Sequence, residues 1–86
     1  MARYEIVLRP SVLKDVRNIP EKDLQRINSR ILELATEPRP WGCVKLSGEE
    51  YYRIRIGDYR VVYEISDRVL LVTVIKVGQR GGIYKQ

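Results

Sequence analysis

The stretch from residue 51 to residue 65, YYRIRIGDYRVVYEI, constrains the fold more than any other part of the chain. Apolar and polar side chains alternate on both sides of Gly57-Asp58, which is the pattern of two strands joined by a tight hairpin. A two-residue loop that begins with glycine suits a turn that needs a positive φ angle. In this register we expect Arg55 to lie directly opposite Arg60.

The hairpin predicts a concentration of positive charge on one face of the sheet. Side chains alternate between faces along a strand, so Arg53, Arg55 and Arg60 share one face. The other face is apolar and carries Ile54, Ile56, Tyr59 and Val61. Like charges directly opposite each other across a strand pair are destabilising. We therefore interpret the three arginines as a binding site for an anion.

An alternative interpretation applies to Arg53 and Arg55 when each is taken singly. Arginine is common on exposed strand faces, where it forms ion pairs with nearby carboxylates such as Glu64 and Asp67. The anion-site interpretation gains weight only if further basic residues meet the hairpin at the same corner of the sheet.

Size and composition predict one small globular domain that spans residues 1–86. Hydrophobic residues make up 44% of the chain and charged residues 31%, as in ordinary globular proteins. The longest apolar-rich run, residues 69–77, is too short to span a bilayer, and the N-terminus lacks the apolar core of a signal peptide. A single cysteine, Cys43, fits a reducing cytoplasm. We expect a cytoplasmic protein without a membrane partner.

The charge balance and the absence of histidine narrow the chemistry. Sixteen Lys and Arg against eleven Asp and Glu give a net charge of +5, which favours nucleic acid or an acidic protein as a partner. With no histidine, the chain cannot form a histidine triad or the paired-histidine acid–base site of many nucleases. One cysteine without histidine leaves no plausible zinc site, so we expect no metal and no cofactor.

Periodicity predicts the remaining elements. Residues 4–9 have strand composition, and Ser11 is a suitable N-cap for a short helix. A second helix is predicted from Glu21 to near Thr36, because Pro38 follows. Its apolar face carries Leu24, Ile27, Ile31 and Leu34.

Two further strands complete the prediction. Residues 44–46 form a short strand, and residues 69–77 form a strand that is apolar at positions of both parities. That strand is either covered on both faces, or covered by helices on one and partly shielded on the other. The order is β-α-α-β-β-β-β, an α+β fold with a mostly antiparallel, twisted sheet packed against an antiparallel helix pair.

Two other features have open interpretations. Lys22, Arg26 and Arg30 on the outer face of the second helix could form a track for nucleic acid, although a solvated helix face is favoured. Trp41 lies in a loop bounded by proline and glycine, and we expect it to anchor that loop on the core rather than to stack on a base.

The last nine residues bring more chemistry to the hairpin. An antiparallel return from residues 59–65 carries the end of the last strand beside the start of the strand that contains Arg60. Arg80 should then emerge near Arg60, and Tyr84 can fold back within reach because the segment contains three glycines.

Several guanidinium groups and one phenol define a particular kind of site. Arginine binds phosphate bidentately and can stabilise the charge of a phosphoryl transition state, while tyrosine can stack on a base. A general base with a pKa near neutral is missing. A larger partner that holds RNA with its 2′-OH aligned for attack on the adjacent phosphate would compensate for that absence.

Nearly the whole chain resembles the RelE/ParE superfamily of bacterial and archaeal toxins. The resemblance is carried by KLSG at residues 45–48, by RIGDYRVVY at residues 55–63 and by VGQR at residues 77–80. It implies a microbial-ribonuclease-like domain and a cognate antitoxin, RelB-like or similar, that masks the basic site. RelE-like members cleave mRNA in the A site of the small ribosomal subunit, with the 2′-OH as nucleophile and without a metal.

The resemblance also implies roles for individual residues. Arg60 and Arg80 would bind the phosphate and stabilise the transition state, and Tyr84 would stack on a base. Arg53 and Arg55 match a basic pair that is often lysine in RelE-like enzymes. Arginine is a poor proton acceptor, so electrostatic activation is the role expected of them.

The tail is less charged than is usual in the family, but it leaves Arg60, Arg80 and Tyr84 in place, and these three residues favour the RNA-cleaving branch. Gln79 and Gly81-Gly82 stand where many relatives carry charged residues. The preferred hypothesis is the toxin of a type II toxin–antitoxin pair that acts as a ribosome-dependent mRNA endoribonuclease. The alternatives are a ParE-like gyrase inhibitor, which cleaves nothing, and a basic RNA-binding domain without activity.

Overall fold

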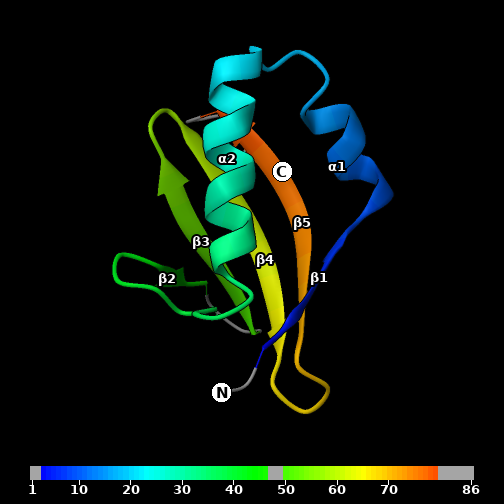
Figure 1. Ribbon diagram of the computed structural model, residues 1–86, viewed down its shortest axis with the longest axis vertical. Coiled ribbons are helices and arrows are strands. Elements are labelled where there is room, and N and C mark those ends of the chain that lie inside the picture. Colours follow the sequence, from blue (N-terminus) through cyan, green and yellow to red (C-terminus); the bar gives the residue numbers. More distant parts are fainter. Residues whose placement is uncertain (1–2, 47–49, 80–86) are drawn as a thin grey trace.

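The sheet is organised around the predicted hairpin. In this computed structural model, residues 3–46 and 50–79 are described. The elements are β1 (Glu5–Leu8), α1 (Pro10–Asp15), α2 (Glu21–Glu33), β2 (Val44–Lys45), β3 (Tyr51–Ile56), β4 (Tyr59–Ser66) and β5 (Leu71–Gln79). The five strands form one sheet in the order β1-β5-β4-β3-β2 (Figure 1). Only β1 and β5 are parallel, so the predicted element order and α+β class are confirmed.

Both helices cover the same face of the sheet. Figure 1 shows α2 lying across the middle of the sheet and α1 lying over β5, with the two helices running in opposite directions. The helices contribute Val12, Ile27 and Ile31 to the core, and Leu34 joins them from the end of α2. The central strands contribute Tyr52, Ile54, Ile56, Tyr59, Val61 and Tyr63. The alternation of β3 and β4 therefore places the predicted apolar face under the helices.

The start of α1 differs from the prediction. The helix begins at Pro10, with Arg9 at the N-cap position, so Ser11 lies inside the first turn and is not the cap. Proline suits the first helical position because its fixed φ matches the helix and its missing N–H would have no partner there. Arg9 is extended, with φ of −66° and ψ of 147°, as expected before a proline.

A bulge in β5 explains why that strand is apolar at both parities. Val62 pairs with Lys76 but Tyr63 pairs with Val74, so Ile75 is an extra residue. The bulge brings Val77 onto the buried side with Val74, and Ile75 is only half-buried. Helices thus cover one face of β5 and the other is partly shielded. Among residues 3–46 and 50–79, no helix is long and apolar enough to cross a membrane.

Candidate functional site

The β3–β4 hairpin has the register that its sequence predicts. Ile56 pairs with Tyr59 and Arg55 pairs with Arg60 on either side of the Gly57-Asp58 loop. Gly57 has a φ of +60°, whereas Asp58 has no positive φ, as in a type II′ turn. The neighbouring apolar side chains are buried under the helices. The arginine side chains of the hairpin therefore project from the opposite face of the sheet, the helix-free face, which neither α1 nor α2 covers.

Arg60 is the only charged residue that is buried among the residues that the structure describes. It is 6% exposed, whereas Arg55 directly across the hairpin is exposed and Arg53 is half-buried. On its other side Arg60 pairs with Gly78 of β5, which has no side chain to compete for space. The three arginines named by the sequence therefore lie together on two adjacent strands.

The end of β5 returns to the beginning of β4. The last described residue, Gln79, pairs with Tyr59, which is the neighbour of Arg60 in the chain. The backbone therefore runs to the predicted corner of the sheet. Arg80 and Tyr84 lie outside the described residues, and their roles remain predictions.

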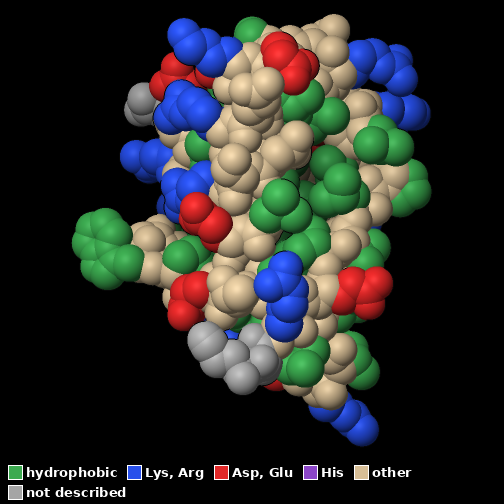
Figure 2. Space-filling view, in the orientation of Figure 1, with side chains coloured by type: hydrophobic (Ala, Val, Ile, Leu, Met, Phe, Trp, Pro, Cys, Tyr) green, Lys and Arg blue, Asp and Glu red, His purple; other side chains and the backbone are tan. Residues whose placement is uncertain are grey.

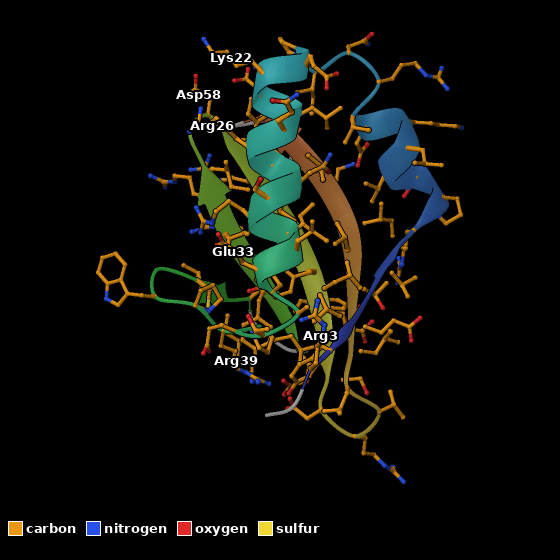
Figure 3. The ribbon with its side chains drawn as sticks, in the orientation of Figure 1. Arg3, Lys22, Arg26, Glu33, Arg39 and Asp58 are labelled. Carbon is orange, nitrogen blue, oxygen red and sulfur yellow. The ribbon has the colours of Figure 1, made fainter. Side chains whose placement is uncertain are left out.

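Basic residues of α2 lie beside the hairpin, and Arg26 is exposed, as the favoured interpretation of a solvated helix face predicts. A Cβ atom built on Gly57 would lie 3.3 Å from Nη2 of Arg26. Arg26, Arg30 and Arg55 line one shallow pocket of about 300 Å³. Figure 3 shows Arg26 at the hairpin end of α2, near Asp58, and Figure 2 shows basic side chains gathered along this edge. The four-residue spacing of Arg26 and Arg30 is the feature of the sequence that puts both arginines on one face of α2.

The loop between α2 and β2 is held by Arg39. Its Nη2 donates to Oδ2 of Asp67 at 2.9 Å, and its Nε donates to the Tyr52 hydroxyl at 3.1 Å. The Tyr4 hydroxyl donates to Oδ1 of the same Asp67 carboxylate at 2.6 Å. The hydrogen bond from Arg39, and then that from Tyr4, hold the pKa of Asp67 below its usual range. Asp67 thus forms its ion pair with Arg39 of this loop.

The sequence predicts that Trp41 anchors this loop on the core, and that prediction is wrong. The side chain of Trp41 is 99% exposed. The physical reason is that neighbouring residues already fix the loop. Arg39 bonds to Asp67, and the buried Pro38 accepts a hydrogen bond of 2.7 Å from the Tyr63 hydroxyl. The loop that leads into β2 projects away from the helices in Figure 1.

Comparison with known proteins defines the class of this chain. The family model described as "ParE toxin of type II toxin-antitoxin system, parDE" matches residues 6–84. A curated protein from Methanocaldococcus jannaschii, named "Putative toxin RelE1", is 33% identical over 89 residues, which cover 96% of this chain and 97% of that protein. Both matches point to the toxin component of type II toxin–antitoxin systems. The chain belongs to the RelE/ParE superfamily.

Solved structures share the fold over almost the full chain. RelE in the archaeal RelE–RelB complex from Pyrococcus horikoshii OT3 superposes with a TM-score of 0.83 and 28% identity, covering 93% of this chain and 98% of that one. The isolated E. coli RelE toxin gives 0.76 and 27% identity, with coverage of 96% and 92%. The strand order and the helix pair are therefore those of RelE toxins.

Proposed function

We propose that this protein is a ribosome-dependent endoribonuclease that cleaves mRNA in the ribosomal A site and so inhibits translation in the cytoplasm. The observation that carries the proposal is the pairing of buried Arg60 with exposed Arg55 across the hairpin. A guanidinium held in place by burial needs little reorganisation to stabilise charge that develops on a phosphate.

The proposed reaction is attack of an mRNA 2′-OH on the adjacent phosphate. Arg60 and Arg80 bind the phosphate and stabilise the transition state, and Tyr84 stacks on a base. Arg53 and Arg55 supply electrostatic activation, because a guanidinium stays charged at physiological pH and does not accept a proton. Alignment of the RNA by the small ribosomal subunit supplies the part of the barrier reduction that a general base would otherwise supply.

The proposed regulatory partner is a cognate RelB-like antitoxin. The relatives from Pyrococcus horikoshii and Methanococcus jannaschii were solved as complexes of RelE with RelB. The net charge of +5 and the arginines of the hairpin suit an antitoxin segment that carries acidic residues over this face.

Single-turnover cleavage of mRNA on programmed ribosomes tests the proposal. We expect Arg60→Ala and Arg80→Ala each to lose at least about tenfold in rate, since removing one donor to a developing oxyanion costs roughly 10²–10³ in enzymes of other classes. Arg68→Ala, which removes an exposed arginine from the β4–β5 turn, serves as the matched control. Circular dichroism melting of Arg60→Ala separates lost activity from lost folding. Cleavage by both site variants at the parent rate would exclude these assignments.

A second function is retained because the matching family model is named for ParE toxins. In that case the protein binds DNA gyrase and cleaves no RNA. Accumulation of cleaved gyrase–DNA complexes, with ribosome-bound mRNA left intact, would establish this function in place of the first.

A further inference from the structure

Trp41 is fully exposed although it plays no part in holding its loop in place. It is the only tryptophan of the chain, and 99% of its side chain is accessible. The loop is fixed by polar contacts of Arg39 and Pro38, so Trp41 contributes nothing to its attachment. A large aromatic side chain left in water forgoes substantial apolar burial. Tryptophan is enriched at binding interfaces, so an exposed tryptophan on a fixed loop is a candidate contact residue.

The surroundings of Trp41 are basic. Together with Gly42 and Val44 it lines a cavity of about 470 Å³ whose other charged walls are Arg30, Arg53 and Arg55. Among the residues that the structure describes, no acidic side chain lines this cavity. Its volume is within the range of small-ligand sites, which is roughly 300–1,000 Å³. An aromatic ring beside several guanidinium groups is the combination that binds single-stranded nucleic acid, with stacking for a base and positive charge for the backbone.

The cavity is continuous with the arginines of the hairpin. Val44 pairs with Arg53 across β2 and β3, and Arg55 pairs with Arg60 across β3 and β4. Adjacent strands lie about 4.8 Å apart, so Val44 and the arginines of β3 and β4 form a short path across three strands. Arg53 and Arg55 belong both to this path and to the proposed cleavage site.

We infer that the Trp41 cavity is a subsite for an unpaired base of the mRNA, on the side of the cleavage site that lies toward β2. The indole of Trp41 stacks on the base, and Arg30 and Arg53 contact the flanking phosphates. This inference rests on the proposed function, because it places the same mRNA strand over Arg55 and Arg60. Charge complementarity and the shared arginines favour mRNA over a protein as the occupant.

Binding of a short oligouridylate tests the subsite without the ribosome. A 2′-O-methyl oligomer cannot be cleaved by 2′-OH attack, and the fluorescence of the single tryptophan reports contact at Trp41 directly. We expect saturable quenching, and an affinity about 5- to 100-fold weaker for Trp41→Ala, the range expected from loss of one stacked base. Trp41→Phe should retain most of the affinity because it keeps an aromatic face. Val69→Ala, which removes another highly exposed apolar side chain far from the cavity, should bind as the parent does.

The outcomes separate this inference from the proposed function. Unchanged fluorescence at saturating oligomer, or affinity of Trp41→Ala within about twofold of the parent, overturns the subsite even if the protein cleaves mRNA on ribosomes. Trp41-dependent binding by a protein that fails to cleave mRNA supports the subsite and rejects the ribonuclease. Fluorescence that responds only to purified antitoxin, or only to ribosomes without mRNA, overturns the inference in favour of a protein or a ribosomal RNA contact.

Discussion

Arg60 lies directly across the β3–β4 hairpin from Arg55, so that two positive side chains share one position on the helix-free face. Residues paired in this way have Cβ atoms about 5 Å apart, and like charges at that separation repel. Burial of Arg60 to 6% exposure limits how far its side chain can move away. Repulsion between the two guanidinium groups at this position favours the binding of an anion beside them.

Replacing Arg55 with glutamine should stabilise the free protein while weakening its activity. We expect the free energy of unfolding to rise by about 0.2–1 kcal/mol at low salt, and the gain to shrink at high salt as screening increases. Urea unfolding at two ionic strengths measures this. Arg68→Gln removes the same charge from the β4–β5 turn and should give no comparable gain. A destabilised Arg55→Gln variant would mean that the arginine pair is not strained.

Arg39 should matter for stability more than its exposed position suggests. Its contacts with Asp67 and Tyr52 connect the loop before β2 to the end of β4 and to β3. We expect Arg39→Ala to lower the free energy of unfolding by about 1–2 kcal/mol, the value for charge-assisted hydrogen bonds discounted for solvent exposure. Fluorescence anisotropy of Trp41 should fall in the same variant, because the loop loses its anchor. Stability and anisotropy equal to those of the parent would show that other contacts hold the loop.

Local alternation was enough to predict the hairpin, because register and side-chain parity depend only on neighbouring residues and on the Gly57-Asp58 turn. The order of elements followed from the same kind of pattern. The position of Trp41 could not be predicted in this way. The position of Trp41 depends on the contact between Arg39 and Asp67, which are 28 residues apart in the sequence. A periodic pattern of apolar residues does not predict such a polar contact.

The bulge in β5 and the arginines of α2 show the same limit. A strand that is apolar at positions of both parities fits either burial of both faces or burial of one face with partial shielding of the other. The extra residue Ile75 in the bulge accounts for the second arrangement, which the structure has. The nearness of Arg26 to Gly57 joins two elements far apart in the chain, so the periodicity of α2 does not predict it. Arg53, Arg55 and Arg60 thus lie where the predicted hairpin register puts them, and Arg26 and Arg30 extend this basic surface onto α2.

Acid should weaken the contact between Arg39 and Asp67. The pKa of Asp67 is lower in the folded protein than its unfolded value of about 3.9, so its contribution to stability is full above that value and is lost as the pH falls through the folded pKa. We expect Asp67→Asn to melt at a lower temperature than the parent at neutral pH, and the difference to disappear in acid. Asp58→Asn, in the hairpin turn, controls for the loss of a carboxylate. A difference that is constant with pH would contradict this account.

Asp15 should connect α1 to the bulge of β5. Its Oδ2 accepts a hydrogen bond of 3.0 Å from the backbone N–H of Val77, two residues after the extra Ile75. Asp15→Ala leaves that N–H without its acceptor, and we expect a loss of about 1–3 kcal/mol. Asp15→Asn keeps an acceptor oxygen and should lose less than half of this. Hydrogen exchange of the Val77 amide provides a local measurement, and protection that survives in Asp15→Ala would contradict the assignment.

Glycine at position 57 should be required mainly because the turn needs a positive φ, and less because Arg26 lies close by. Its φ of +60° costs a residue with a Cβ atom about 1–2 kcal/mol, so Gly57→Ala should destabilise the protein by about that amount. The nearest atoms belong to the end of the flexible Arg26 side chain, which can move away. Gly42→Ala is the matched comparison, because Gly42 has a φ of +93° with no atom near its Cβ position.

A double-mutant cycle with Arg26→Ala separates the two terms for Gly57. We expect a coupling energy below about 0.5 kcal/mol, since a flexible neighbour that yields adds little to the backbone cost. A larger coupling would mean that Arg26 is held rigidly against the turn. In that event Arg26 would belong to the fixed part of the basic surface, and Arg26→Ala alone should weaken binding of the uncleavable oligouridylate. Unfolding in urea and oligomer affinity, measured on the same four proteins, distinguish these outcomes.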